Sequence, residues 1–436
     1  MTSARYVIIG NSIAAINAIE GIRERDNKGD ILIISDEEHP IYSRPLITYY
    51  LCDKVGDEGL LYRPSSFHAD YNVLTMLGRR AVRLDTGKRM VVLDDDTKVG
   101  FEKLLIATGG TPIIPDVPGK DLQGTFTFTT LDDSLCLKRF ITDHDVKRVV
   151  VVGGGLIGLK VTEALLALSI KVVIVELADR ILSATFDLTA SRMIERALNT
   201  SGCTIITQNT VQEIREGEKG RVGTVLLKGD RSIDCDAVIM AIGVRPRLDL
   251  ATGTTITTDK GILVDRHLRT GAEDIYAAGD VIECNDCINN IRRPIAILPN
   301  AAKQGRVAGC NMAGGSRIYE GCMAMNSIEL AGIPTISVGL TDPSLLPDEK
   351  RRKGIEVLQD SSDEDSVYKK IVIEKNRIIG VIMIGRIDRA GIYTGLIRDK
   401  VDISSFKDLL LRDDFGLLSL PREYRKHIVV GQGIEV

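Results

Sequence analysis

Apolar residues gather in short continuous runs along the chain, and two of these runs lead directly into glycine-rich turns. The runs at residues 7–9 and 149–152 contain only valine and isoleucine. Continuous apolar strands of this kind are typical of parallel sheets that are covered on both faces. After each turn, apolar residues recur at helical spacing, and another apolar run follows at residues 31–34 and 172–175. The order strand, glycine turn, helix and strand thus occurs twice, which predicts two nucleotide-binding units with separate sheets.

Two more apolar runs end in glycine and indicate where the chain passes between these units. Residues 104–107 lead into glycines at 109 and 110 and then into a proline-rich link at residues 112–118. Residues 237–242 lead into Gly243 and Pro246. Because proline-rich connectors are rigid, both segments are expected to be domain crossings. The simplest arrangement inserts the second unit into the first.

The rest of the chain predicts a third, smaller domain. Alternating strands are expected at residues 368–374 and 378–384, and the charged stretch 348–365 before them is expected to be a solvated loop or hairpin. The expected fold class is α/β, with two Rossmann-like dinucleotide-binding domains, one inserted in the other, plus a smaller C-terminal α+β domain. The expected boundaries are 1–113 and 246–324 for the first domain, 114–245 for the second and 325–436 for the third.

Composition limits the class of protein. The chain has 436 residues, of which 44% are hydrophobic and 27% are charged, as in a globular protein of two or three domains. The net charge of −4 provides no general attraction to nucleic acid or to anionic membranes. No apolar run approaches the ~18–20 residues that a membrane helix requires. We expect no signal peptide, because the first strand begins near Arg5, and we therefore expect a cytoplasmic protein.

The cysteines and histidines do not form an evident metal site. Only Cys284 and Cys287 have a suggestive spacing, and with Cys310 and Cys322 they would supply four thiolates to an iron–sulfur cluster or to zinc. Because that spacing is long and irregular, buried or incidental thiols are favoured. A surface redox pair of Cys284 and Cys287 is an alternative that the sequence leaves open.

The second glycine turn carries the complete dinucleotide signature. Gly153, Gly155 and Gly158 have the G-x-G-x-x-G spacing, and Glu176 ends the next strand about twenty residues later. The Glu176 carboxylate would accept hydrogen bonds from both adenosine ribose hydroxyls and would repel a 2′-phosphate, which favours NADH over NADPH. Arg180 lies close enough in the sequence to weaken this preference, unless it faces solvent or pairs with an acid.

The first turn departs from the signature. Gly10 permits a tight turn and Ala15 permits close packing of the helix on the strand, but Ser12 stands where a glycine is usual. The Ser12 hydroxyl would still donate to a phosphate oxygen, and the helix N-terminus would attract a diphosphate. An acid just after the second strand, Asp36 or Glu37, would bind a ribose hydroxyl. Taken alone, this turn fits an ordinary glycine turn as well as a nucleotide site.

Further segments show a resemblance to a known family. Residues 107–109 and 241–246 mark the two crossings, and residues 276–280 read Tyr-Ala-Ala-Gly-Asp, like the end of the second FAD signature. Together they resemble the two-dinucleotide flavoprotein reductases of the pyridine nucleotide–disulfide oxidoreductase superfamily, over residues 1–325 approximately. The resemblance implies FAD on the first unit and NAD(P)H on the second.

The resemblance also implies roles for single residues. Asp280 would bind the ribityl chain, and a helix that begins near Asn300 would point its N-terminus at the flavin pyrimidine. Arg44 and Pro45 would lie along the isoalloxazine. The two turns and the resemblance together nominate the cofactor-binding residues Gly10, Ser12, Ala14, Ala15, Asp36, Glu37, Arg44, Pro45, Ala107, Thr108, Gly109, Gly153, Gly155, Leu156, Ile157, Gly158, Glu176, Gly243, Gly279, Asp280, Asn300 and Ala301.

Two segments narrow the resemblance. Residues 42–46 and 390–395 resemble a branch that contains rubredoxin reductases, the flavin part of assimilatory nitrite reductases, and flavoprotein subunits linked to iron–sulfur partners. The chain departs from these relatives where Tyr49 replaces a frequent lysine and Lys160 replaces a frequent glutamate. Glu163, one turn further along the same helix, would either substitute for that glutamate or lie at the surface.

Disulfide chemistry needs a redox cysteine beside the flavin. Residues 41–50 contain no cysteine, and Cys52 just beyond them lies in an apolar context that is typical of a packed thiol. Disulfide reductase and single-cysteine peroxidase activities are therefore disfavoured.

The expected activity is transfer of hydride from NADH to FAD and of electrons onward to an iron–sulfur or rubredoxin-type protein, with the reverse direction left open. No side-chain nucleophile or base is required, so no catalytic residue and no metal are nominated. The basic run 350–353 would steer an acidic ferredoxin or rubredoxin, unless it is only a solvated loop. An NADH oxidase that uses O2 and a redox-responsive NADH/FAD binding protein are the alternatives. A homo-oligomer is compatible with the sequence.

Overall fold

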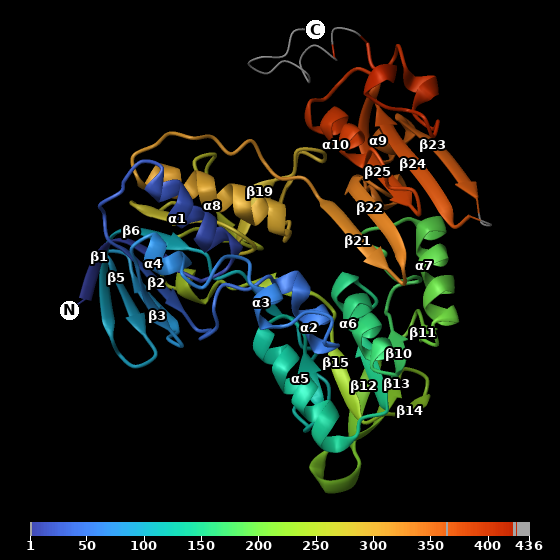
Figure 1. Cartoon of the computed structure of the whole chain (residues 1–436), viewed down its shortest axis with the longest axis horizontal. Helices are drawn as coiled ribbons and strands as arrows, with labels where there is room; N and C mark the ends of the chain where they lie inside the picture. The colour runs from blue at the N-terminus through green and yellow to red at the C-terminus, as the bar shows by residue number, and fades with distance from the viewer. Residues whose placement is uncertain (1, 363–364, 422–423, 425–436) are drawn as a thin grey trace. The chain divides into compact units, whose positions relative to one another are not determined.

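The computed structural model describes residues 2–362, 365–421 and 424, and the chain divides into two compact units (Figure 1). The first unit comprises Met1–Leu177 and Asn209–Met323, and the second comprises Ala178–Gln208 and Ala324–Val436. In the part of the chain that the structure describes, no helix is long and apolar enough to cross a membrane.

The first sheet of the first unit is built from the apolar runs that the sequence indicates. Its strand order is β3-β2-β1-β6-β5-β4, and β18 pairs with β6. β1 and β2 are parallel; β2 is buried throughout and β1 is buried over residues 6–9, as the continuous apolar runs require. The bounds are β1 Thr2–Ile9, β2 Ile31–Ser35, β3 Val73–Leu77, β4 Ala81–Asp85, β5 Met90–Leu93, β6 Lys98–Ile106 and β18 Ile275–Ala277.

The strand β18 comes from a distant part of the sequence. It runs parallel to β6, with Ile275 opposite Leu104 and Ala277 opposite Ile106. Since the chain between β6 and β18 builds a separate sheet, the first Rossmann-like domain is discontinuous and the second is inserted in it. The predicted fold class is confirmed in this respect.

The helices α1 (Ile13–Arg23) and α8 (Leu298–Met312) lie side by side, so close that their backbones are in contact (Figure 1). A Cβ atom at Gly305 would lie 2.0 Å from the carbonyl oxygen of Ala14, and one at Gly309 would lie 2.0 Å from that of Ala18. A larger residue at either glycine would force the two helices apart. This contact fixes the start of α8 relative to the turn that opens α1.

The second sheet of this unit contains the parallel strands β10, β9, β15 and β8 in that order. An antiparallel group, β12, β13 and β14, follows in the sequence and interrupts the Rossmann-like order. The bounds are β8 Thr125–Thr127, α5 Leu131–His144, β9 Arg148–Val152, α6 Leu156–Ala167, β10 Lys171–Val175, β12 Val211–Glu216, β13 Val222–Leu227, β14 Ser232–Asp234 and β15 Ala237–Met240.

The two segments expected to be crossings form one antiparallel ribbon. β7 (Gly110–Pro112) pairs with β16 (Val244–Pro246), so that Pro112 lies opposite Val244 and Gly110 opposite Pro246. The smaller elements of the unit are α2 Ile47–Leu51, α3 Asp57–Leu60, α4 Phe67–Asp70, β17 Ile262–Leu263, β19 Ile282–Asn285 and β20 Arg292–Arg293.

The second unit is a five-stranded antiparallel sheet with helices. The strand order is β21-β22-β25-β24-β23, and the predicted strands at 368–374 and 378–384 correspond to β24 and β25. The bounds are α7 Leu188–Thr200, β11 Thr204–Ile206, β21 Met325–Leu330, β22 Ile333–Gly339, α9 Glu349–Lys353, β23 Ile355–Ser362, β24 Val367–Glu374, β25 Arg377–Ile384 and α10 Ala390–Arg398.

Of the two alternatives for the charged stretch 348–365, a solvated loop or a hairpin, the structure shows the hairpin, because β23 pairs antiparallel with the next strand, β24. The stretch forms the short helix α9 and the edge strand β23, and its residues 363–364 lie outside the described part. Asp348 caps α9 by accepting a hydrogen bond from the backbone of Arg351, and Arg351 pairs with Glu374 at 3.0 Å. The polar sequence is explained by an edge strand, which needs no second apolar face.

Candidate functional site

The first glycine turn lies against the end of β6. Gly10 has a φ of +121°, and a Cβ atom there would lie 2.3 Å from the carbonyl oxygen of Ala107, so only glycine fits. Ser12 caps α1 from extended backbone, and its side chain makes no cap hydrogen bond. The turn brings together at the carboxyl edge of the first sheet the nominated residues Gly10, Ser12, Ala14, Ala15, Ala107, Thr108 and Gly109.

The two acids after β2 have different partners. Asp36 accepts a hydrogen bond from Arg247 at 2.6 Å. Glu37 pairs with Arg44 and accepts a hydrogen bond from the Tyr42 hydroxyl at 2.5 Å. Glu37 therefore orients Arg44, and Asp36 is the acid beside Arg247. The sequence alone did not separate the two acids.

The turn after β18 is held by a residue that the sequence did not reveal. The backbone N–H of Gly279 donates to Oε1 of Gln304 at 2.8 Å, and Gln304 is only 2% exposed. Burial raises the pKa of the neighbouring Asp280, and the charge of Arg44 opposes this shift. The sequence feature that could have indicated Gln304 is its position one helical turn after Asn300.

The start of α8 is tied to the residues just before the helix and to Met323, which follows it in the sequence. Asn300 and Ala301 are in the first turn of α8, and Asn300 is buried. The Asn300 side chain donates to the carbonyl oxygens of Ile295, at 3.4 Å, and Met323, at 3.5 Å. These contacts orient the first turn of α8.

The second turn has the geometry that its complete signature predicts. A Cβ atom at Gly158 would lie 2.0 Å from the carbonyl oxygen of Gly153. A Cβ atom at Gly155 would have no other atom within 4 Å. The Glu176 carboxylate accepts a hydrogen bond from the backbone N–H of Gly154 at 2.6 Å. The nominated residues Gly153, Gly155, Leu156, Ile157, Gly158 and Glu176 are thus together at the start of α6.

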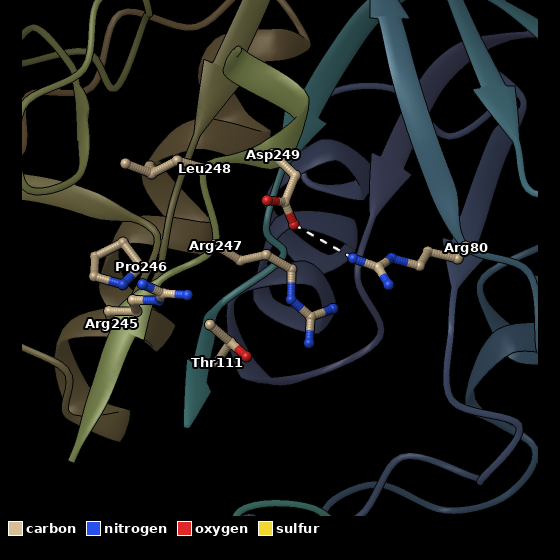
Figure 2. Close-up of a pocket in the computed structure, with 7 residues that line it drawn as sticks. All are labelled: Arg80, Thr111, Arg245, Pro246, Arg247, Leu248 and Asp249. Atoms are coloured by element: carbon tan, nitrogen blue, oxygen red, sulfur yellow. Dashed lines mark hydrogen bonds and ion pairs between the residues drawn. The ribbon is translucent and has the colours of Figure 1, made fainter. Parts of the chain in front are cut away.

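A pocket of about 480 Å³ opens at the β7–β16 ribbon (Figure 2). Figure 2 shows Arg80 reaching Asp249 across this opening, with an N–O distance of 3.3 Å. Arg247, which also lines the pocket, is the partner of Asp36. The nearby Gly243 has a φ of +115°. The pocket residues are Arg80, Thr111, Arg245, Pro246, Arg247, Leu248 and Asp249.

Comparisons with known proteins identify the family. Residues 4–305 match the model for pyridine nucleotide-disulphide oxidoreductases, and residues 325–401 match that for the C-terminal domain of rubredoxin NAD+ reductase. The chain belongs to the pyridine nucleotide-disulphide oxidoreductase family. It is an NAD(P)H:acceptor flavoprotein oxidoreductase, and its family implies binding of FAD and NAD(H).

The chain is 31% identical to the epsilon subunit of the NADH-dependent phenylglyoxylate dehydrogenase from Aromatoleum evansii, over 92% of this chain and 93% of that one. It is 27% identical to a nitrite reductase of Bacillus subtilis over 93% of this chain, but it spans only 48% of that protein. A crystal structure of a ferredoxin reductase from Rhodopseudomonas palustris has a TM-score of 0.80 and 27% identity, covering 91% of this chain and 95% of that one. The branch that the sequence resembles is therefore confirmed.

The residues present fit the two dinucleotides of this oxidoreductase family. Nothing lies within 4 Å of a Cβ position at Gly109 or Gly155, so a ligand can approach the backbone at both places. The first amide groups of α1 and α6 lack intrahelical acceptors and suit diphosphates. Asp280 and Glu176 carry carboxylates, the kind of group that accepts hydrogen bonds from ribose hydroxyls.

The departures at positions 49 and 160 lie together in this family member. Lys160 donates to the Tyr49 hydroxyl at 3.3 Å, and its ammonium nitrogen lies 2.5 Å from the carboxylate of Glu163. Glu163 is therefore the partner of Lys160. Burial alone would lower the pKa of Lys160, but Glu163 and Tyr49 together outweigh burial and raise that pKa.

Arg180 belongs to the second unit, where it pairs with acids. Its guanidinium contacts Asp179 at 3.0 Å and Asp342 at 2.9 Å, and the residue is only 8% exposed. Of the alternatives for Arg180, the structure favours pairing with an acid over exposure to solvent.

The cysteines follow a pairing that the spacing did not indicate. Cys284 forms a disulfide with Cys322, so the interpretation of Cys284 and Cys287 as a redox pair is wrong, and Cys284 is not an incidental thiol. Cys310 is buried and free, and Cys52 is a partly buried thiol. Over residues 2–362, 365–421 and 424, no group of three or more acid, histidine or cysteine side chains is placed to hold a metal.

Proposed function

We propose that this chain transfers electrons from NADH, through FAD, to a small iron–sulfur or rubredoxin-type protein. The proposal rests on residues 41–50, which contain Arg44 and most of α2 and would lie beside the flavin. These residues include no cysteine. A disulfide substrate would need a thiolate there. The match to the rubredoxin NAD+ reductase C-terminal domain and the likeness to a ferredoxin reductase support the acceptor class.

When bound, FAD supplies acceptance of hydride from the nicotinamide and release of electrons to the acceptor. The chain contributes binding and orientation. The Gly10 turn and the N-terminus of α1 would hold the diphosphate, and Asp280, whose turn is fixed by Gln304, would bind the ribityl hydroxyls. Arg44, held by Glu37, would lie along the isoalloxazine.

The second turn would hold the nicotinamide nucleotide. The N-terminus of α6 would bind its diphosphate, and Glu176 would bind the adenosine ribose. The position of the Glu176 carboxylate, 2.6 Å from the Gly154 nitrogen, supports this assignment. A carboxylate there repels a 2′-phosphate, which supports NADH as the donor. The domain boundaries at residues 113, 245 and 324 are part of the same proposal.

The test is anaerobic reduction of the purified FAD-loaded protein by NADH or NADPH, followed by mixing with acceptors. We expect NADH to bleach the flavin absorbance faster than NADPH does. We expect oxidised ferredoxin or rubredoxin to restore the absorbance faster than air does. Rapid aerobic consumption of NADH without any protein acceptor would contradict the proposed acceptor and favour an NADH oxidase. Slow turnover with every acceptor, together with partner binding only in the reduced state, would favour a redox-responsive binding protein.

A further inference from the structure

We propose that Asp342 strengthens the preference for NADH by holding Arg180 in an ion pair, so that its guanidinium is not available to a 2′-phosphate. The inference rests on the proposed NADH site at Glu176. Arg180 follows Glu176 by four residues in the sequence. An arginine shortly after the acid of a dinucleotide fold is the group that accommodates the 2′-phosphate of NADP. The chain therefore carries a suitable arginine, and its use depends on what holds it.

The contacts of Arg180 explain why it would not bind a nucleotide. Nη2 lies 2.9 Å from Oδ2 of Asp342, and Nη1 lies 3.0 Å from Oδ1 of Asp179. The guanidinium charge is thus matched by two carboxylates within the second unit. The Nε atom is buried and has no hydrogen-bond partner among the residues that the structure describes. One donor of Arg180 is therefore left unsatisfied in its present position.

Asp342 is oriented by a neighbour other than Arg180. Its Oδ1 accepts hydrogen bonds from the backbone N–H of Ser344 at 3.0 Å and from the Ser344 hydroxyl at 2.5 Å. Its other oxygen, Oδ2, remains for the guanidinium of Arg180. A carboxylate that is already oriented by its neighbours loses little conformational freedom when it binds a cation.

The backbone beside Arg180 is also held. The N–H of Ile181 donates to Oε1 of Glu195 at 3.2 Å, and the carbonyl of Ile181 accepts from the Ser191 hydroxyl at 2.8 Å. Both partners lie on α7. Because the backbone is anchored, loss of Asp342 would redirect the side chain of Arg180 rather than the loop.

The experiment measures binding of two adenosine probes to the FAD-loaded protein by calorimetry, so that it does not depend on turnover. The probes are 5′-AMP and adenosine 2′,5′-bisphosphate, which differ by the 2′-phosphate. In D342A we expect about tenfold tighter binding of the bisphosphate, because a released arginine gains one charge-assisted contact. Binding of 5′-AMP should change by less than about twofold.

Four further variants make the result specific. R180M alone should leave both affinities unchanged, whereas R180M in the D342A background should abolish the gain. D342N keeps a hydrogen-bond acceptor and serves if D342A loses its fold; it should show a smaller gain of about threefold. D413N is the matched control, because Asp413 pairs with Arg386 at the surface of the same unit, with side chains 72% and 56% exposed.

The outcomes separate the inference from the proposed function. If the unchanged protein prefers 5′-AMP but neither D342A nor D342N gains affinity for the bisphosphate, the role of Asp342 is overturned and the NADH site stands. If R180M weakens bisphosphate binding in the unchanged background, Arg180 is not sequestered, which also overturns the role. If the unchanged protein binds both probes equally, the proposed NADH preference fails, and the inference fails with it.

Discussion

The ammonium nitrogen of Lys160 lies 3.3 Å from the hydroxyl oxygen of Tyr49 and 4.8 Å from the centre of its ring. Tyr49 is in α2, which follows Arg44, and Lys160 is in α6, which opens at the second glycine turn. The pair thus joins the two segments that carry the candidate FAD and nicotinamide sites. Of this pair, α6 carries the cation and α2 carries the hydroxyl group.

Replacing Lys160 by methionine should slow reduction of the FAD-loaded protein by NADH by about tenfold, the effect of losing roughly 1.4 kcal/mol of electrostatic stabilisation. FAD content should be unchanged, because the binding turns are elsewhere. Rapid mixing under anaerobic conditions measures the rate, and Y49F is the control that removes the hydroxyl but keeps the aromatic ring. An unchanged rate in K160M would mean that this charge does not act on hydride transfer.

The Lys160–Glu163 pair predicts a pH dependence of stability. Since the pKa of Lys160 is raised in the folded protein by Glu163 in spite of burial, its contribution is complete below the unfolded value of about 10.4 and is lost as the pH rises through the folded value. The difference in unfolding free energy between the unchanged protein and K160M should therefore be constant from about pH 6 to 9 and fall above about pH 10.4. A difference that declines already near neutral pH would contradict this.

Replacing Glu176 by glutamine should weaken NADH binding by about tenfold and narrow the preference over NADPH, because the neutral amide accepts weaker hydrogen bonds and repels no phosphate. The Gly154 N–H would keep an acceptor, so the turn should remain intact. Fluorescence quenching titrations with both nucleotides measure the effect. If neither affinity changes, Glu176 lies outside the ribose site.

The sequence predicted the parts of the fold that depend on local patterns. The buried parallel strands and both glycine turns follow from short runs such as residues 7–9 and 149–152, whose apolar character requires cover on both faces. For the stretch 348–365 the sequence left a loop and a hairpin open, because an edge strand can be as polar as a loop.

The candidate site was predicted less completely, because several of its contacts join residues far apart in the sequence. The bond from Gly279 to Gln304 depends on the packing of α8, which no local pattern encodes. The pairing of Asp36 with Arg247 joins residues that are 211 positions apart. Only the structure therefore shows that Asp36 pairs with Arg247 and that Glu37 pairs with Arg44.

The Cys284–Cys322 disulfide predicts a thiol count. Protein denatured without reductant should react with a thiol reagent at six cysteines, and reduced protein at all eight. In the chain-entropy view, closing a loop with a separation of 38 residues stabilises the fold by at most about 4 kcal/mol. C284S should therefore lower the unfolding free energy, and C136S, which changes an exposed free cysteine, should not. Eight reactive thiols in unreduced protein would show that the bridge does not form.

The buried pair of Asp187 and Lys370 predicts a strong coupling within the second unit. Asp187 caps α7 through the N–H of Ala190, and its Oδ2 lies 2.7 Å from both the Lys370 nitrogen and the Tyr368 hydroxyl. The two charged residues are only 7% and 6% exposed. Removing one charge leaves the other buried and unmatched, so D187N or K370M should each cost about 3–5 kcal/mol of unfolding free energy.

The double variant D187N/K370M should cost clearly less than the sum of the two single changes, because no buried charge of the pair is left uncompensated. Denaturant unfolding of the FAD-loaded protein, followed by a signal from the second unit, measures the cycle. The exposed pair Arg386–Asp413 is the control, and its removal should cost no more than about 1 kcal/mol. Additive costs for Asp187 and Lys370 would show that the two residues stabilise the unit independently, which would contradict the coupling.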